Sequence, residues 1–259
     1  MNRHSMRRKA VFGATALCFV ASVYAAGAAE NAATGVAYPK GHYGALNALP
    51  DWGGIWTLNF PGPGAKRETP TLKGKYLEDF KAWQRDSEAH HGQGRKVGAN
   101  NCTPPGMPYI MAVGQYPIEF LFTPGRVTLH HEAWMQWRNI FTDGRGHPDT
   151  EPSFYGHSTG KWDGDTLVVD TVNIKTTVPL VPGSYHSDKI HIVERMSLDK
   201  KNADTLLVQI TVDDPVALEK PYTNTLSYSR SREGDLLEFI CAENDRNPVD
   251  ASGNTQFDE

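Results

Sequence analysis

The sequence predicts a mainly β protein whose strands form an antiparallel meander closed on itself as a barrel, with a β-sandwich as the alternative. Short runs rich in β-branched and aromatic residues follow one another from residue 117 onward. Gly, Pro, Asp and Asn residues separate these runs at regular intervals, as expected of turns. One amphipathic helical stripe precedes them, and the sequence shows no internal repeat.

Residues 1–28 are predicted to be a cleaved signal peptide. A basic stretch without acids is followed by an apolar segment, and Ala26-Gly27-Ala28 fits an A-x-A cleavage site. An uncleaved membrane anchor is the alternative, but the apolar segment is short for a membrane span. We therefore expect a periplasmic or secreted protein, with no membrane insertion after signal cleavage.

One β-rich domain is predicted at 51–247, after an extended arm at 29–50 and before a flexible tail at 248–259. Its first strand lies in "DWGGIWTLNF" (51–60), which "PGPG" ends. A helix is expected at about 71–88, because apolar residues recur every three or four positions there: Leu72, Tyr76, Phe80 and Trp83. This stripe is interpreted as a packing face.

The charge balance and the cysteines narrow the function classes. The chain has a formal net charge of −4, and the signal peptide holds basic but no acidic residues, so the remainder is more acidic still. We expect no nucleic-acid partner, because such proteins need a concentrated basic surface. Cys18 leaves with the signal peptide, and Cys102 and Cys241 are predicted to form a disulfide in an oxidising compartment. Two free thiols or a catalytic cysteine are the alternatives.

A hairpin prediction brings two ionisable residues together. Asp163-Gly164 predicts a two-residue turn, and with that turn His157 lies directly opposite Asp170. The carboxylate would fix the tautomer of the imidazole, as a general base or acid requires. A structural ion pair between two strands is the alternative. A two-residue turn at Pro124-Gly125 would in the same way pair Glu119 with His130 and Ile118 with His131.

The loop "FTDGRGHP" (141–148) adds candidate side chains, because functional residues often lie on loops. His147 and His186 are predicted as further proton-transfer groups, while Arg145 would contact a carboxylate or phenolate of a ligand. The predicted substrate-binding residues are Arg145, Asp143, Glu132, Arg138 and Trp162.

No cofactor is predicted. The sequence contains no H-E-x-x-H, no cysteine cluster, no G-x-S-x-G and no phosphate-binding loop in a strand–turn–helix context. A divalent metal remains the alternative because histidines are abundant, and its ligands would then be His147, His157 and His186.

Several motifs together resemble a widespread family of secreted bacterial β-rich proteins of unassigned function. They are "CTPPGMP", "PIEFLFTPGRV", "RNIFTDGRGHP", "YGHSTGKWDGDTLVVDT", "HSDKIHIVER" and "EFICAENDRN", and they cover roughly residues 50–247. This resemblance implies a site around Asp143, Arg145, His147, His157, Asp170 and His186. Gly54-Ile55-Trp56 on the first predicted strand also resembles the G-x-W of lipocalin-like (calycin) barrels, and the expected fold is therefore lipocalin-like.

The sequence thus favours an exported barrel enzyme that acts on a small apolar or aromatic molecule by metal-independent acid–base chemistry of the lyase, isomerase or hydrolase type. His157 would be the base or acid, and Asp170 would orient it. The first alternative is a non-catalytic periplasmic binding protein for a hydrophobic small ligand. The second alternative is a metal-dependent barrel enzyme.

Overall fold

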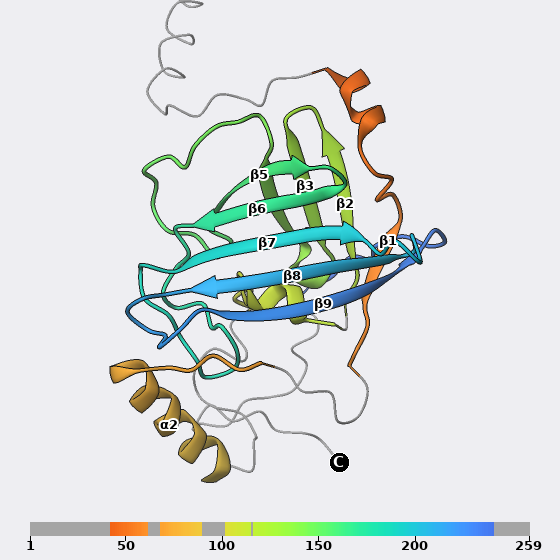
Figure 1. Cartoon of the computed structure of the whole chain (residues 1–259). Coiled ribbons are helices and arrows are strands. Elements are labelled where there is room, and N and C mark those ends of the chain that lie inside the picture. Colours follow the sequence, from red (N-terminus) through yellow and green to blue (C-terminus); the bar gives the residue numbers. More distant parts are fainter. Residues whose placement is uncertain (1–41, 62–67, 90–101, 115, 241–259) are drawn as a thin grey trace, which may run out of the picture. The chain divides into compact units, whose positions relative to one another are not determined.

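The computed structural model describes residues 42–61, 68–89, 102–114 and 116–240 (Figure 1). The predicted signal peptide, Cys241 and the predicted C-terminal tail lie outside the described residues, so the cleavage site and the Cys102–Cys241 disulfide stay predictions. In the described part of the chain, no helix is both long and apolar enough to cross a membrane.

Nine strands form a closed barrel in chain order, which confirms the predicted barrel and excludes the sandwich. The strands are β1 (Ile55–Leu58), β2 (Ile118–Thr123), β3 (Arg126–His131), β4 (Gln136–Phe141), β5 (His157–Asp163), β6 (Thr166–Val172), β7 (His191–Leu198), β8 (Thr205–Asp213) and β9 (Tyr222–Ser231). Three short 3-10 helices are described as well: η1 (Tyr43–Ala48), η2 (Tyr109–Ala112) and η3 (Ala133–Met135). The described part of the predicted arm is therefore not wholly extended.

One strand pair departs from the predicted antiparallel meander. Strands β4 and β5 are parallel and pair only at Ile140–Ser158 and Phe141–Thr159. A parallel neighbour requires a connection that returns along the barrel, and the crossing loop (residues 142–156) makes that return. This loop carries His147 to β5 and β6.

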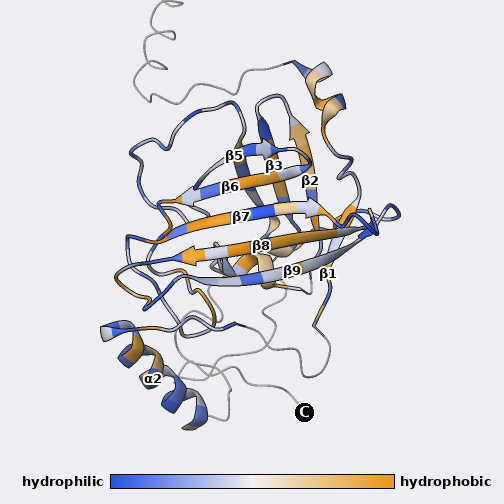
Figure 2. Ribbon diagram, viewed as in Figure 1, coloured by the Kyte–Doolittle hydropathy of each residue, from blue (hydrophilic) through white to orange (hydrophobic). Residues whose placement is uncertain are grey.

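Alternating burial along the strands separates an inward from an outward face. In β6 every second residue is buried, from Leu167 through Val169 to Thr171. Strand β8 alternates in the same way from Leu206 to Val212, and Figure 2 shows apolar segments along both strands. The inward side chains fill the barrel, so its core is packed rather than hollow.

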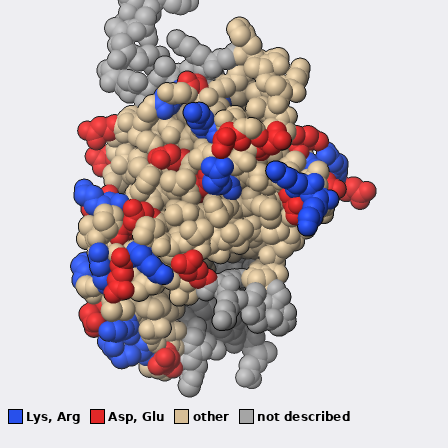
Figure 3. Space-filling view, viewed as in Figure 1, with Lys and Arg blue, Asp and Glu red and all other residues tan. Residues whose placement is uncertain are grey.

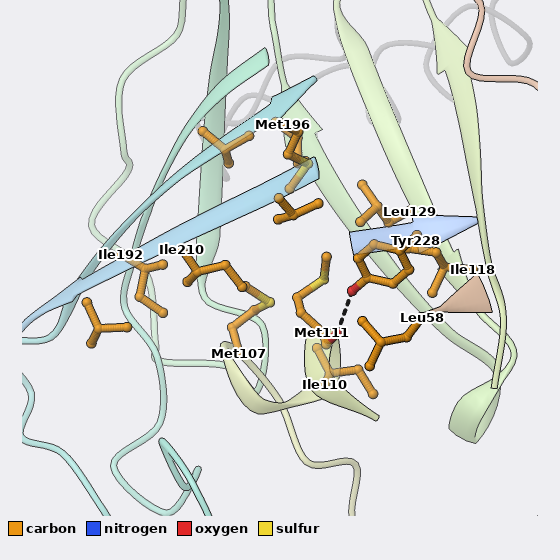
Figure 4. Packing of buried hydrophobic residues seen from close by; sticks show 14 of the residues in the cluster. Leu58, Met107, Ile110, Met111, Ile118, Leu129, Ile192, Met196, Ile210 and Tyr228 are labelled. Carbon is orange, nitrogen blue, oxygen red and sulfur yellow. Dashed lines mark hydrogen bonds between the residues drawn. The ribbon is translucent and has the colours of Figure 1, made fainter. Parts of the chain in front are cut away.

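The segment 106–113, which contains η2, closes one end of the barrel. Met107, Ile110 and Met111 of this plug are buried among inward side chains of the strands (Figure 4). The hydroxyl of Tyr228 on β9 donates a hydrogen bond to the carbonyl of Met111. The plug is therefore fixed to β9 by both packing and a buried hydrogen bond.

The predicted helix is present as α2 (Gly74–Ala89), which begins a few residues later than expected. Leu72 instead forms a β-bridge with Leu218. Phe80 stacks on Trp83, and Trp83 in turn lies against Gly183, where an added Cβ would be 2.1 Å from the indole. No residue of α2 is fully buried, so the helix covers the periphery of the barrel rather than forming its core.

Candidate functional site

The β5–β6 hairpin differs from its predicted register by one position on each strand. The turn residues are Gly164 and Asp165, because Asp163 pairs with Thr166. Gly164 has φ of 59°, which fits a type II′ turn with glycine at its first central position. His157 therefore lies opposite Val172, and Asp170 lies opposite Thr159. A shift of this size keeps His157 and Asp170 on the same, outward face of the sheet.

His147 from the crossing loop bridges the two residues that were predicted to meet. Its Nε2 lies 2.8 Å from Asp170 Oδ1, and its Nδ1 lies 2.8 Å from His157 Nδ1. The second carboxylate oxygen, Oδ2 of Asp170, lies 2.8 Å from Nε2 of His191 on β7. Thr159 Oγ1 lies 3.4 Å from His147 Nε2. We call His147, His157, Asp170 and His191 the His–Asp array.

The carboxylate determines which nitrogen of each imidazole carries the proton. Ionised Asp170 only accepts hydrogen bonds, so His147 and His191 both donate through Nε2–H. In neutral His147 the Nδ1 atom is then an acceptor, and His157 donates to it through Nδ1–H. This assignment satisfies all three hydrogen bonds with neutral imidazoles. It leaves His157 Nε2 and His191 Nδ1 as the free acceptor nitrogens.

The two free nitrogens differ in accessibility. Nε2 of His157 is buried and has no hydrogen-bond partner among the described residues. The ring of His191 is 43% exposed, and its Nδ1 has no partner in the described part of the chain. Burial lowers the pKa of His157, and the nearby guanidinium of Arg145 acts in the same direction. The accessible base of the array is therefore His191.

The crossing loop also packs aromatic and charged groups behind His157. The ring of Phe141 stacks on His157 with centroids 5.2 Å apart, and the guanidinium of Arg145 lies 4.1 Å from the centroid of Phe141. Arg145 forms a bidentate ion pair with Asp143, whose pKa is lowered by those hydrogen bonds. Arg145 is thus engaged by Asp143, which makes it a support for the loop rather than an open anion clamp.

A polar cleft of about 800 Å³ is lined by residues that lie close in the chain to three members of the array, although no member of the array lines it. Asp149 follows His147 by two residues, and Asn173 follows Asp170 by three. Lys189 precedes His191 by two residues. Its walls carry three carboxylates and two lysines, and Figure 3 shows acidic and basic residues interspersed on this face of the molecule. The lining residues are Asp149, Thr150, Glu151, Pro152, Asn173, Ile174, Lys175, Thr176, Thr177, Asp188 and Lys189.

Two predicted site residues, Arg138 and His186, lie away from the array. Arg138 is 1% exposed and points into the barrel, where its guanidinium pairs with Glu194. His186 is also buried, and its Nδ1 lies 2.8 Å from the carbonyl of Ser187. Burial lowers the pKa of His186, so it remains neutral. The predictions of Arg138 as a substrate contact and His186 as a proton-transfer group were wrong, because alternation and loop packing place both in the interior.

Two further predicted substrate contacts have structural partners elsewhere. Glu132 Oε2 accepts a hydrogen bond from the backbone of Leu237. Trp162 packs edge-on against Trp52 and lies 6.0 Å from Phe122, at the end of the hairpin opposite the array. Neither residue contacts the His–Asp array, so their predicted role as substrate contacts stays a prediction that is separate from the array.

The sequence interpretation missed His191 as a member of the site. The signal for it lies in the β6–β7 register, where Asp170 pairs with Val193. His191 is two residues before Val193 and so shares the outward face with Asp170. Only the pairing of β6 with β7 shows that the two residues are neighbours, because a long connection separates the two strands in the sequence.

The three histidines named as alternative metal ligands do not converge on one point. His147 and His157 are joined to each other through Nδ1 atoms, while His186 lies in the interior. Within the described ranges, no group of three or more His, Cys, Asp or Glu side chains is arranged to hold a metal ion.

Comparisons with known proteins assign the chain to no family. No protein-family model matches the chain, and no curated protein matches it. Among solved structures, a mutant of the fluorescent protein UnaG matches with a TM-score of 0.30 and 12% identity, over 70% of this chain and 97% of that one. We base no inference on a likeness at this score, and the barrel assignment rests on the strand pairing described above.

Proposed function

We propose that the protein is an acid–base catalyst whose His–Asp array acts on a small molecule bound in the polar cleft. The observation that carries this proposal is the pair of 2.8 Å contacts that Asp170 makes to His147 and His191. They hold His191 in the tautomer that presents Nδ1 as a base, and the carboxylate stabilises the imidazolium that forms when Nδ1 takes a proton.

The remaining members of the array act on the same carboxylate. His147 donates to Asp170 Oδ1 and so orients the carboxylate, and His157 donates to His147 and so orients that ring. Thr159 limits the rotation of the His147 ring from the other side. In this proposal His191 touches the substrate, and His147 and His157 are positioning residues.

The cleft favours a polar substrate over the apolar or aromatic one expected from the sequence. Hydroxyls, carboxylates and lysine ammonium groups line it, and Ile174 is buried beneath them. A ligand with several hydrogen-bonding groups would satisfy such walls, whereas a hydrocarbon would leave them desolvated and unpaired.

Proton abstraction from a carbon acid tests the proposal directly. We expect the wild-type protein to catalyse ring opening of 5-nitrobenzisoxazole, a general probe for positioned bases. His191→Gln should lower the rate about 100-fold or more, the size of effect typical of a lost general base. His42→Gln is the matched control, because His42 is exposed and lies outside the array. Equal rates for His191→Gln and wild type would refute the proposed role of His191.

A non-catalytic binding protein for a hydrophobic ligand is the second candidate, and the packed interior constrains it. Arg138 and Glu194 occupy the middle of the barrel, and the plug occupies one end. An apolar ligand would therefore bind beside the plug, where small hollows remain. Retained ligand together with unchanged probe turnover in His191→Gln would favour this candidate.

A further inference from the structure

Two adjoining hollows lie between the plug and the inward face of β9. The larger, of about 280 Å³, lies between η2, β8, β9 and the loop at 180–182. The smaller, of about 250 Å³, extends from it toward β1. Both are lined by Ala112, Asn224 and Leu226, so they form one elongated space. We call this space the plug crevice.

We propose that the plug crevice is a binding site for a small neutral or cationic aromatic molecule, separate from the His–Asp array. The array occupies the outward face of β5, β6 and β7, whereas the crevice is formed by η2 and the inward residues of β9. The two sites therefore share no residue, and this inference stands independently of the proposed catalysis.

Most of the residues that line the larger hollow are apolar or carry a ring. These residues are Pro108, Tyr109, Ala112, Leu180, Val181, Pro182, Ile210 and Leu226, and Glu68, Thr69, Tyr222 and Asn224 complete the lining. Proline rings, tyrosine rings and branched aliphatic chains offer flat contacts that suit a planar ligand. The volume lies near the lower end of the range for small-molecule pockets, roughly 300–1,000 Å³. The crevice thus fits one or two fused rings rather than a long chain.

Three polar groups determine which ligand chemistry is accepted. The side-chain amide of Asn224 and the hydroxyl of Tyr222 have no hydrogen-bond partner among the described residues, although both side chains line the larger hollow. Burial raises the pKa of Tyr222 to about 12, so its hydroxyl stays protonated and can donate. Glu68 is the one charged lining residue in the described part of the chain.

Among the described residues that line the hollows, a negatively charged ligand would meet the carboxylate of Glu68 and no basic side chain. No Lys, Arg or His is among the described residues that line either hollow. An anion moved into an apolar crevice would also lose its hydration without gaining an ion pair. We therefore expect neutral rings and aromatic amines to bind more tightly than aromatic carboxylates.

The test compares three molecules with one ring system. Indole, tryptamine and indole-3-acetate are titrated into the full chain carrying ¹³C-labelled Ile and Leu methyl groups. Indole and tryptamine should shift the methyl signals of Leu180, Ile210 and Leu226, with saturation. Indole-3-acetate should bind at least tenfold more weakly. Equal binding of the carboxylate, or shifts confined to methyl groups outside the crevice, would overturn the proposal.

Two variants localise the binding. Ala112→Leu inserts a larger side chain where the two hollows meet and should abolish the indole-induced shifts. Ala203→Leu is the matched control, since Ala203 is exposed and remote from the crevice, and it should bind indole like wild type. If Ala112→Leu does not fold, Asn224→Leu decides, because it keeps the shape and removes the amide. Asn224→Leu should lower tryptamine affinity several-fold, and unchanged affinity would contradict the site.

Discussion

Strands β5 and β6 carry two polar networks on opposite faces of the sheet, formed by residues that are adjacent in the sequence. His157 and Asp170 point outward into the His–Asp array, while the adjacent Ser158 and Thr171 point inward and are at most 1% exposed. The inner network saturates its hydrogen bonds, whereas the outer one leaves acceptor nitrogens free. The comparison teaches that position on the pleat, rather than residue type alone, separates groups that stabilise the fold from groups that can act on a ligand.

The inner network is centred on Arg138. Its guanidinium forms a bidentate pair with Glu194, and it also donates to Thr171 Oγ1 at 3.0 Å and to Ser158 Oγ at 3.2 Å. The two hydroxyls are 2.9 Å apart and bond to each other as well. With its donors engaged and 1% exposure, Arg138 has no means of meeting a substrate.

The largest effect is expected when one member of the inner ion pair is removed. Arg138→Met leaves the Glu194 carboxylate buried without a countercharge, which costs about 3–5 kcal/mol of unfolding free energy. Urea denaturation followed by tryptophan fluorescence measures the loss. The matched control is Arg195→Met: Arg195 is the next residue after Glu194, points outward and pairs with Asp163 at the surface. That variant should lose less than about 1 kcal/mol.

A double variant sharpens the same comparison. Arg138→Met with Glu194→Leu removes both charges together, and the hydroxyls of Ser158 and Thr171 keep their mutual hydrogen bond. We expect it to recover most of the stability lost in Arg138→Met. A double variant no more stable than Arg138→Met would contradict this expectation, and it would show that the barrel loses stability when apolar side chains replace the ion pair.

Acid should also act more strongly on the interior than on the surface. His131 is completely buried, and burial lowers its pKa to about 3, with the charge of Arg138 acting in the same direction. Its pKa in the unfolded chain is near 6.5. Below that pH the unfolded chain binds a proton that the folded protein does not. The stability is therefore fully present above pH 6.5 and is lost progressively as the pH falls toward 3.

Each pH unit in that window costs about 1.4 kcal/mol, so His131 alone removes about 2 kcal/mol between pH 6.5 and 5. Replacing the ring by His131→Leu should flatten this part of the stability profile, measured by urea denaturation at each pH. His42→Leu, at an exposed position, should leave the profile unchanged. A slope in His131→Leu equal to that of wild type would show that His131 is already protonated in the folded barrel.

The sequence predicts these networks only in part. The Pro124-Gly125 turn placed Glu119 against His130 and Ile118 against His131, and both pairs are confirmed. Alternation then requires His130 and His131 to face opposite sides. The Asp163-Gly164 prediction was wrong by one residue on each strand, because glycine takes the first turn position rather than the second. The prediction that His157 and Asp170 lie on the same face of the sheet is still correct, but the predicted direct pairing of the two residues is not.

The bridging role of His147 could not be derived from local patterns. It depends on the parallel pairing of β4 with β5, which sends the crossing loop back over the hairpin. Loop paths of this length are set by tertiary packing, here by the stacking of Phe141 on His157. The inward position of Arg138 follows from the alternation of β4, but the barrel axis has to be known before one face can be called the interior.

The smallest effect on stability is expected for a substitution in the outer network. There the measured quantity is the position of the imidazole protons. Asp170→Asn should change the unfolding free energy by less than about 1 kcal/mol, because Asp170 is 44% exposed and its two contacts are solvent-screened. An amide offers one acceptor oxygen and one donor nitrogen, so it cannot accept Nε2–H bonds from both His147 and His191. One imidazole must therefore invert its tautomer or lose its hydrogen bond.

¹⁵N imidazole spectra should show His147 and His191 in the Nε2–H form in wild type and a mixed population in the variant. Asp163→Asn is the control, because it removes an outward carboxylate of the same hairpin without touching an imidazole. If both imidazoles kept a single Nε2–H tautomer in Asp170→Asn, the carboxylate would not be what orients them, and the packing around the two rings would have to do so instead.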